Sequence, residues 1–186
     1  AWSLTERPGF LRLKTNKIVS NVYAARNTIS QRMEGPRCSA SVTLDLRHMV
    51  DGDRCGLAAF NGHSGLLTIV RDGKSYKLVQ SNTLVHLTDR EKAITGVDED
   101  VVEQVDLKRC KKIQLRIDGD FTPGKDIATF YYKIGKGEWT PIGEPFKMQF
   151  DYRRLFMGTR YAIFNYATKQ SGGYVDVDSF DYSREE

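Results

Sequence analysis

The stretch CSASVTLDL, residues 38–46, alternates small or branched apolar residues with polar ones. Successive side chains of a strand point to opposite faces, so this pattern predicts a strand with one buried face and one wet face. The same period of two recurs in IQLRID at 113–118 and in VDVD at 175–178. Beyond 178, Phe180 and Tyr182 occupy the alternate positions that the aspartates held, not those of the valines. This change predicts either a β-bulge or a strand that crosses from one environment to another.

Turn residues separate the predicted strands and join two pairs of them into hairpins. One hairpin runs from 66–70 through Asp72-Gly73 into 76–79, and the second runs from 128–132 through Gly135 to Trp139. The polar stretch 88–106 has no sustained helical spacing of apolar residues, and we expect a short helix or a long loop there.

About ten to twelve short strands with frequent turns indicate an all-β fold, a two-sheet antiparallel β-sandwich. The length of 186 residues suits a single domain spanning 1–186, with one core and little helix. Because no apolar run approaches about 18 residues, we expect no membrane partner.

The charges are spread along the chain, whose formal net charge is +4. One short basic cluster stands out, formed by Lys108, Arg109, Lys111 and Lys112. Without a recognisable motif, such a cluster is most simply a solvated loop, and we expect no nucleic-acid partner. Cys38, Cys55 and Cys110 have no paired spacing and are expected to be free thiols that act as small hydrophobic residues.

Catalytic constellations are missing from the sequence. A small glycosidase needs two facing carboxyl groups, but the glutamates lie in turns and in the polar stretch. Asp45, Asp176 and Asp178 occupy the polar faces of strands, where we expect them to be solvated. We therefore expect no enzyme activity from this chain alone, and an autonomous small glycanase is kept as an alternative hypothesis.

Two Asp-Gly-Asp turns, at 51–53 and at 118–120, raise the question of a metal site, because alternate carboxylates can face one calcium ion. Neither continues into a complete calcium-binding loop, and hairpin turns explain both. No cofactor is required by the sequence, and a structural calcium ion stays open, with Asp51, Asp53 and Asp178 as its candidate ligands.

Aromatic residues make up 11% of the chain, more than a core strictly needs. Sugar rings stack on aromatic faces, and their hydroxyls bond to amide and guanidinium groups. Two stretches mix these side chains densely, residues 26–32 and 160–166. Their candidate binding residues are Arg26, Asn27, Gln31, Arg32, Arg160, Tyr161, Asn165 and Tyr166.

Five motifs resemble, in order and spacing, the concanavalin A-like C-terminal domain of glycoside hydrolase family 43 β-xylosidases, a module also classed as xylan-binding. They are RPGFLRL (7–13), ARNTISQR (25–32), GDRCGLAAF (52–60), GTRYAIFNY (158–166) and GGYVDVD (172–178). The resemblance covers nearly the whole chain. It implies a concanavalin A-like jelly roll that follows a five-bladed propeller, which would carry the catalytic carboxylates in a larger glycosidase.

The resemblance also implies that a loop near residues 16–23 reaches toward the active-site mouth, although Val22-Tyr23 departs from the phenylalanine of that loop. We expect the domain to bind xylan or a xylo-oligosaccharide. Its guanidinium and amide groups would bond to hydroxyls, and its tyrosines would form a rim. The alternative is an interaction domain that packs on the catalytic propeller, stabilises it and shapes its active-site mouth.

Overall fold

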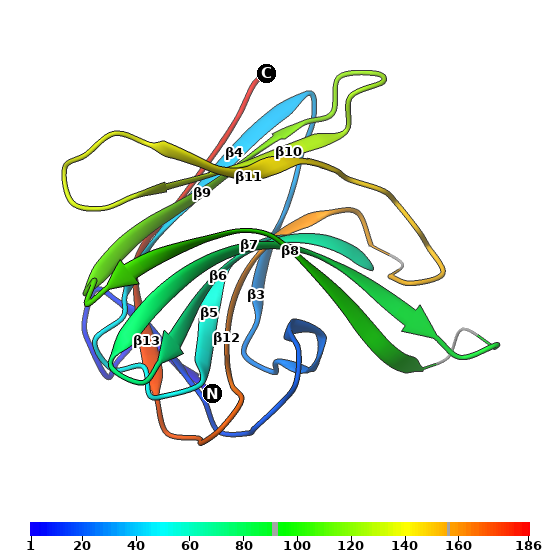
Figure 1. Ribbon diagram of the computed structural model, residues 1–186. Coiled ribbons are helices and arrows are strands. Elements are labelled where there is room, and N and C mark those ends of the chain that lie inside the picture. The colour runs from blue at the N-terminus through cyan, green and yellow to red at the C-terminus, as the bar shows by residue number, and fades with distance from the viewer. Residues whose placement is uncertain (91–92, 156) are drawn as a thin grey trace.

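Two antiparallel sheets pack face to face in the computed structural model, which describes residues 1–90, 93–155 and 157–186 (Figure 1). In spatial order, the seven-stranded sheet contains β1 (Trp2–Ser3), β2 (Leu11–Lys14), β13 (Tyr174–Arg184), β4 (Arg37–Asp45), β9 (Lys112–Asp120), β10 (Ile127–Lys133) and β11 (Thr140–Lys147). The six-stranded sheet contains β3 (Ile29–Arg32), β12 (Arg160–Ala167), β5 (Asp53–Phe60), β6 (His63–Asp72), β7 (Ser75–Leu87) and β8 (Ile94–Lys108). This architecture confirms the predicted all-β, two-sheet antiparallel sandwich.

Helical structure in the described ranges is limited to η1, a turn of 3₁₀ helix over Val22–Ala24. None of the described segments forms a helix long and apolar enough to cross a membrane.

The core lies between the sheets and follows the alternation of the sequence. Ala40, Val42 and Leu44 of β4 are almost fully buried, and β9 contributes Leu115 and Ile117 opposite them. Burying a side chain of this size contributes about 1.5–3 kcal/mol relative to leaving it exposed. The period of two therefore decides which face of each strand enters the core.

The β-bulge is confirmed. The pairing of β13 with β4 shifts register between Val177 and Ser179, so that Asp178 is the extra residue. Val177 packs in the main core before the shift, and Phe180 and Tyr182 pack against the same core after it. The inserted residue reverses which positions of the strand face the core. The apolar side chains before and after it therefore lie on the same face.

Residues 88–106 do not form a helix or a long loop, so this expectation was wrong over the described part of the stretch. Residues 94–108 are β8, a 15-residue strand that pairs along β7; residues 91 and 92 lie outside the described residues. β8 is an edge strand, and acidic side chains on an edge oppose pairing with other chains. Its polar composition therefore reflects its position at the edge and not an absence of structure.

Both predicted hairpins are present. β6 pairs with β7 across Asp72-Gly73, and β10 pairs with β11 across Gly135. The cysteines are free thiols, as expected, with Cys38 and Cys55 buried; Cys110 is only partly buried.

Asp45 and Asp176 are not solvated, and that expectation was wrong. Their side chains are 5% and 1% exposed, because Arg7 and Arg12 from the N-terminal segment cover this part of the seven-stranded sheet. Arg12 binds Asp176 through two nitrogens, at 2.8 and 3.0 Å, and Arg7 bridges both aspartates, at 2.8 and 3.0 Å. Burial alone would raise the pKa of Asp176, but the hydrogen bonds from Arg12 and Arg7 outweigh it and lower the pKa.

Candidate functional site

The two stretches predicted to bind sugar lie side by side in the fold. β3 pairs with β12 so that Arg32 lies opposite Arg160 and Ile29 lies opposite Ile163. Since neighbouring side chains of a strand point to opposite faces, the predicted residues are divided between the interior and the outer face of the six-stranded sheet. The two stretches therefore do not form one binding surface.

Three predicted residues have structural roles that remove them from a binding surface. The ring of Tyr161 lies between the sheets, is 1% exposed, and its hydroxyl is 3.3 Å from the thiol of Cys38. The amides of Asn27 and Asn165 donate to the backbone carbonyls of Lys14 and Leu13, at 2.9 and 2.8 Å. A buried polar group needs such a partner, so these amides hold β2 and the segment that follows it in place.

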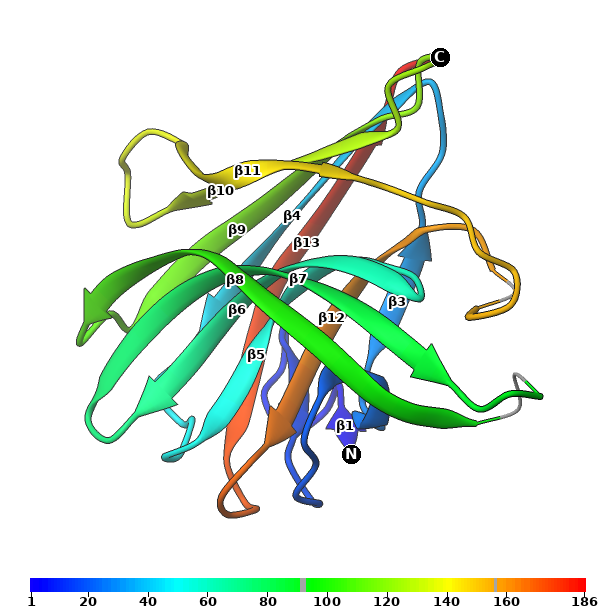
Figure 2. The ribbon, with the colours of Figure 1, turned by 45° about the vertical axis from the view of Figure 1, so that its right-hand side comes forward.

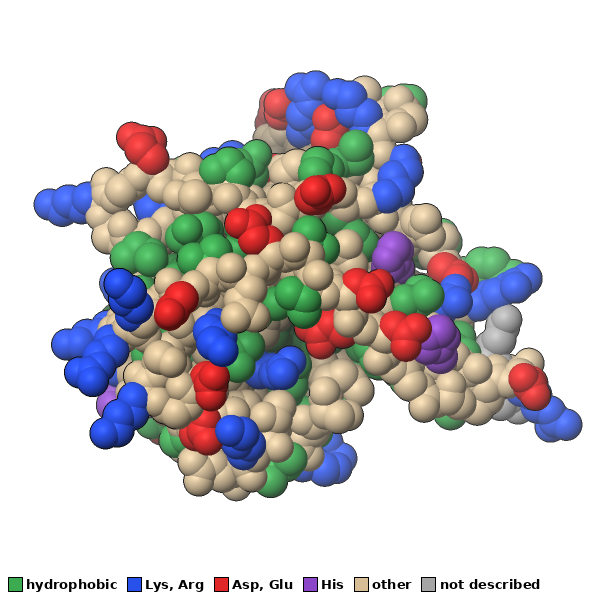
Figure 3. Space-filling model, viewed as in Figure 1, with side chains coloured by type: hydrophobic (Ala, Val, Ile, Leu, Met, Phe, Trp, Pro, Cys, Tyr) green, Lys and Arg blue, Asp and Glu red, His purple; other side chains and the backbone are tan. Residues whose placement is uncertain are grey.

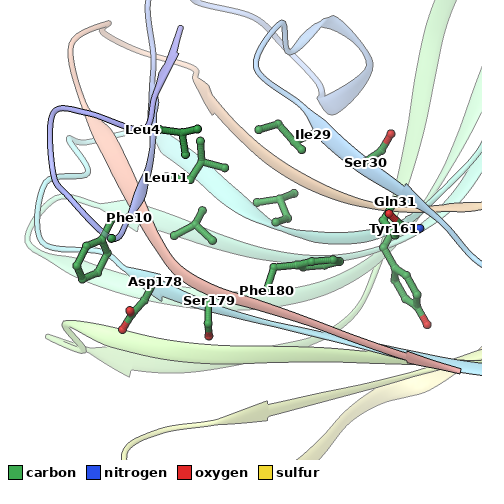
Figure 4. A pocket seen from close by; sticks show the side chains of 13 residues that line it. Leu4, Phe10, Leu11, Ile29, Ser30, Gln31, Tyr161, Asp178, Ser179 and Phe180 are labelled. Atoms are coloured by element: carbon green, nitrogen blue, oxygen red, sulfur yellow. The ribbon is translucent and has the colours of Figure 1, made fainter.

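Four predicted residues remain at the surface. Arg26, Gln31 and Arg32 are exposed, and Arg160 is half-buried, with its Nε donating to Ser30 Oγ at 2.8 Å. Gln31 borders an apolar groove of about 400 Å³ where the sandwich is open between β3 and the β2–β13 edge. Figure 4 shows Leu4, Leu11, Ile29 and Phe180 facing into this groove. Such a lining offers little to sugar hydroxyls.

Tyr166 lies on the outer face of the six-stranded sheet. With Phe164, Val22 and neighbours it forms a small second core on this face. The segment that contains η1 lies over β12 there (Figure 2). Tyr23 anchors this segment, because its hydroxyl is 2.7 Å from both Asn61 O and Ser64 Oγ. Val22 and Tyr23 therefore point into the domain. Ile18, in the same loop at 16–23, is 52% exposed and points away from it.

A hollow of about 370 Å³ opens on this outer face, between the η1 segment and the extended β7–β8 hairpin. We call it the Glu99 hollow. Its polar lining residues are Ser20, Asn21, Thr83, Thr95, Glu99 and Tyr166, and its apolar ones are Val22, Leu66, Ile94 and Val97. Of the sequence-predicted site residues, Tyr166 alone lines it.

One hydrogen bond and one ion pair hold the carboxylate of Glu99 at the wall of this hollow. Its Oε1 accepts from Ser81 Oγ at 2.9 Å, and its Oε2 is 3.8 Å from a guanidinium nitrogen of Arg54. Burial raises the pKa of Tyr166, and the charge of Arg54 opposes that effect. Glu99 is the only carboxylate among the described lining residues, whereas glycoside hydrolysis uses two. The arrangement is suited to accepting hydrogen bonds from hydroxyls.

The candidate metal ligands do not form one cluster. Asp51 accepts from Gly73 N at 2.7 Å and pairs with Lys169, and Asp178 pairs with Lys112. Asp53 is fully buried, with Oδ2 accepting from Val50 N at 3.0 Å, and burial raises its pKa to about 6. No three His, Cys, Asp or Glu side chains in the described ranges gather around a common point.

Comparison with known proteins gives a consistent picture. A family model described as the β-xylosidase C-terminal concanavalin A-like domain matches residues 1–183. A bifunctional GH43-CE protein of Bacteroides eggerthii has 35% identity and a TM-score of 0.86 over 100% of the chain and 22% of its own length. An engineered GH43 glycoside hydrolase, described as having both endo-xylanase and exo-arabinofuranosidase activity, has 30% identity and a TM-score of 0.86 over 98% of the chain and 36% of its own.

A β-xylosidase of Formosa agariphila is 26% identical over 97% of the chain. The chain spans 31% of that relative. It therefore corresponds to one part of each of these proteins.

Proposed function

We propose that this chain, which belongs to the family of β-xylosidase C-terminal concanavalin A-like domains, binds a xylo-oligosaccharide in the Glu99 hollow. It would do so as an accessory domain of a family 43 glycosidase. The observation that carries the proposal is the hollow itself, where a fixed carboxylate, hydroxyls and an amide converge beside a few apolar side chains. The catalytic carboxylates would lie in another module of the parent enzyme.

The chemistry of the hollow matches a pentose chain. Glu99 and the exposed hydroxyls of Ser20 and Thr95 can bond to sugar hydroxyls, and Ile94 and Val97 can contact C–H faces. Xylose hydroxyls give up hydration on binding, so the surplus is small and we expect a Kd of about 1 mM. An affinity of this order keeps a xylan chain near the catalytic module for a short time and lets it dissociate readily.

Glu99→Gln is expected to weaken xylohexaose binding by about fivefold to tenfold, because it replaces charge-assisted hydrogen bonds with neutral ones while keeping the side-chain size. Calorimetry of the domain with xylohexaose measures the effect. Asp100→Asn is the matched control, since Asp100 is the next residue of β8, is exposed, and lies opposite Asn82 in the ladder. Equal affinities for wild type and Glu99→Gln would remove the hollow from the proposal.

A second candidate function is docking on the catalytic module. Exposed apolar side chains lie on the loop at 16–23, on β8 and on the loop before β12. The β7–β8 hairpin and the loop before β12 project from the same end of the sandwich (Figure 2). These side chains, with their exposed fractions, are Ile18 (52%), Ile94 (49%), Phe150 (63%), Tyr152 (57%) and Met157 (44%). An exposed apolar group of this kind is typical of an interaction surface.

Docking predicts that adding the isolated domain raises the melting temperature of a separately produced catalytic module by about 2 °C or more. Phe150→Asp with Tyr152→Asp should abolish the rise, because it places charges in the contact. Trp2→Asp is the control, since Trp2 is equally exposed, at 62%, but lies on the edge strand β1 of the other sheet. An unchanged melting temperature with the wild-type domain would exclude docking as the main function.

A further inference from the structure

A basic groove lies on another part of the molecule, between the β8–β9 turn and the tip of the β10–β11 hairpin. It has a volume of about 650 Å³ and contains Arg109, Lys111, Lys112 and Lys133 in its lining. Lys136, in the turn of the same hairpin, is exposed. Figure 3 shows Lys and Arg side chains gathered at the left of the view, the side on which these two turns lie in Figure 1. The fold thus adds a second cationic segment to the basic cluster at 108–112.

Most of these cations have no carboxylate partner. Lys112 pairs with Asp178, whereas Arg109, Lys111 and Lys133 form no salt bridge with any residue in the described ranges. Uncompensated like charges repel one another, and an anion that lies between them relieves this repulsion. The groove is therefore electrostatically prepared for a negatively charged ligand.

Two aromatic rings, those of Trp139 and Tyr131, lie next to the groove but outside its lining. The ammonium of Lys133 lies 4.8 Å from the centre of the Trp139 ring, and the Arg116 guanidinium lies 5.3 Å from that of Tyr131 and 5.7 Å from that of Trp139. Gln114, on the outer face of β9, contributes an amide to the groove lining. Rings beside amide and guanidinium groups are what the stacking and hydroxyl bonding of a sugar chain require.

We propose that this basic groove binds the uronic acid carboxylates of an acidic xylan, with the neighbouring sugar rings lying along Trp139 and Tyr131. The proposal rests on the proposed function in taking xylan as the ligand, and it adds a second surface to the Glu99 hollow. We expect a ligand of sparse charge, because carboxylates accompany the cations: Asp178 pairs with Lys112, Asp106 precedes the basic segment 108–112, and Glu138 follows Lys136 in the β10–β11 hairpin. A nucleic acid, with one charge for about every 1.7 Å of duplex, would meet these carboxylates repeatedly.

The test compares affinities for glucuronoxylan, neutral arabinoxylan and a single-stranded DNA. Glucuronoxylan should bind about tenfold more tightly than arabinoxylan in about 50 mM NaCl, and the gap should close in about 0.5 M NaCl as the charges are screened. Lys111→Glu with Lys133→Glu should remove the gap. The control, Lys17→Glu with Lys74→Glu, changes the net charge by the same amount at exposed lysines outside the groove. It should leave the difference in affinity between the two xylans unchanged. Glucuronoxylan should also slow alkylation of Cys110, which lines the groove.

Equal affinities for the two xylans, or a gap that survives the Lys111/Lys133 reversal, would overturn the proposal. DNA that binds as tightly as glucuronoxylan would also overturn it, because the groove would then be a general polyanion surface. If xylohexaose binding depends on Glu99 but glucuronoxylan binds no more tightly than arabinoxylan, this inference fails and the proposed function stands. If the acidic preference depends on Lys111 and Lys133 while Glu99→Gln has no effect, the groove stands and the hollow fails.

Discussion

Replacing Asp176 by asparagine is expected to lower the free energy of unfolding by about 3 kcal/mol at pH 7, because it leaves Arg7 and Arg12 without their shared carboxylate partner. Asp176 is 1% exposed, and both arginines are packed over the strand that carries it. The N-terminal segment is held by this charge network, so we also expect it to become susceptible to proteolysis. Urea unfolding and limited proteolysis measure the two effects.

The neighbouring residue Asp178 provides the control for this prediction. It bulges from the same strand, is partly exposed, and pairs with Lys112, so Asp178→Asn should change stability by no more than about 1 kcal/mol. The pKa of Asp176 is lowered in the folded state, so its contribution is complete above its unfolded pKa and is lost as the pH falls through the folded value. The Asp176→Asn deficit should therefore be full above about pH 5 and shrink below about pH 4. A deficit unchanged at pH 3 would show that the network is not electrostatic.

Tyr161→Ala is expected to destabilise the domain by about 3–5 kcal/mol, because it empties the space of a large ring between the two sheets. The ring packs near Tyr182 of β13, with centroids 6.1 Å apart, and it belongs to the main core. A loss of this size is a large fraction of the stability of a single domain. Chemical denaturation of the variant measures it.

Tyr161→Phe separates the ring from its hydroxyl. The hydroxyl has a thiol partner, Cys38, at 3.3 Å, and we expect a change of no more than about 1 kcal/mol with unaltered xylohexaose binding. Reduced binding by a fully folded Tyr161→Phe protein would return Tyr161 to the ligand site and contradict the placement of its ring in the core.

Local patterns were sufficient to predict the sandwich. The alternation in β4 and β9, the Asp72-Gly73 turn and the parity change at Asp178 each depend on interactions between near neighbours in the chain, and each is present in the structure. Hydrophobic burial imposes the same period on every strand, so these signals do not require knowledge of the tertiary arrangement.

The candidate site could not be predicted in the same way. The Glu99 hollow joins Ser20, Thr83, Glu99 and Tyr166, which lie far apart in sequence and share no motif. β8 carries Glu99, and its edge position gave it the polar composition of a loop. The aromatic-amide stretch at 160–166 does not form one surface, because alternation along β12 sends Tyr161 inward and Tyr166 outward.

The burial of Asp176 shows the same limit. Its covering residue Arg12 is 164 positions away in the sequence, and no pattern local to β13 distinguishes a solvated aspartate from one covered by an arginine. Such pairs become visible only once the topology places β2 beside β13.

Titration of xylohexaose into the isotopically labelled domain, followed by amide chemical shifts, tests the central claim most directly. We expect shifts that reach half of their maximum at about 1 mM ligand and are concentrated at residues 20–22, 94–99 and Tyr166, the segments that line the Glu99 hollow. An absence of shifts at that concentration, or shifts confined to other surfaces such as Arg26, Gln31 and Arg32, would contradict the proposal.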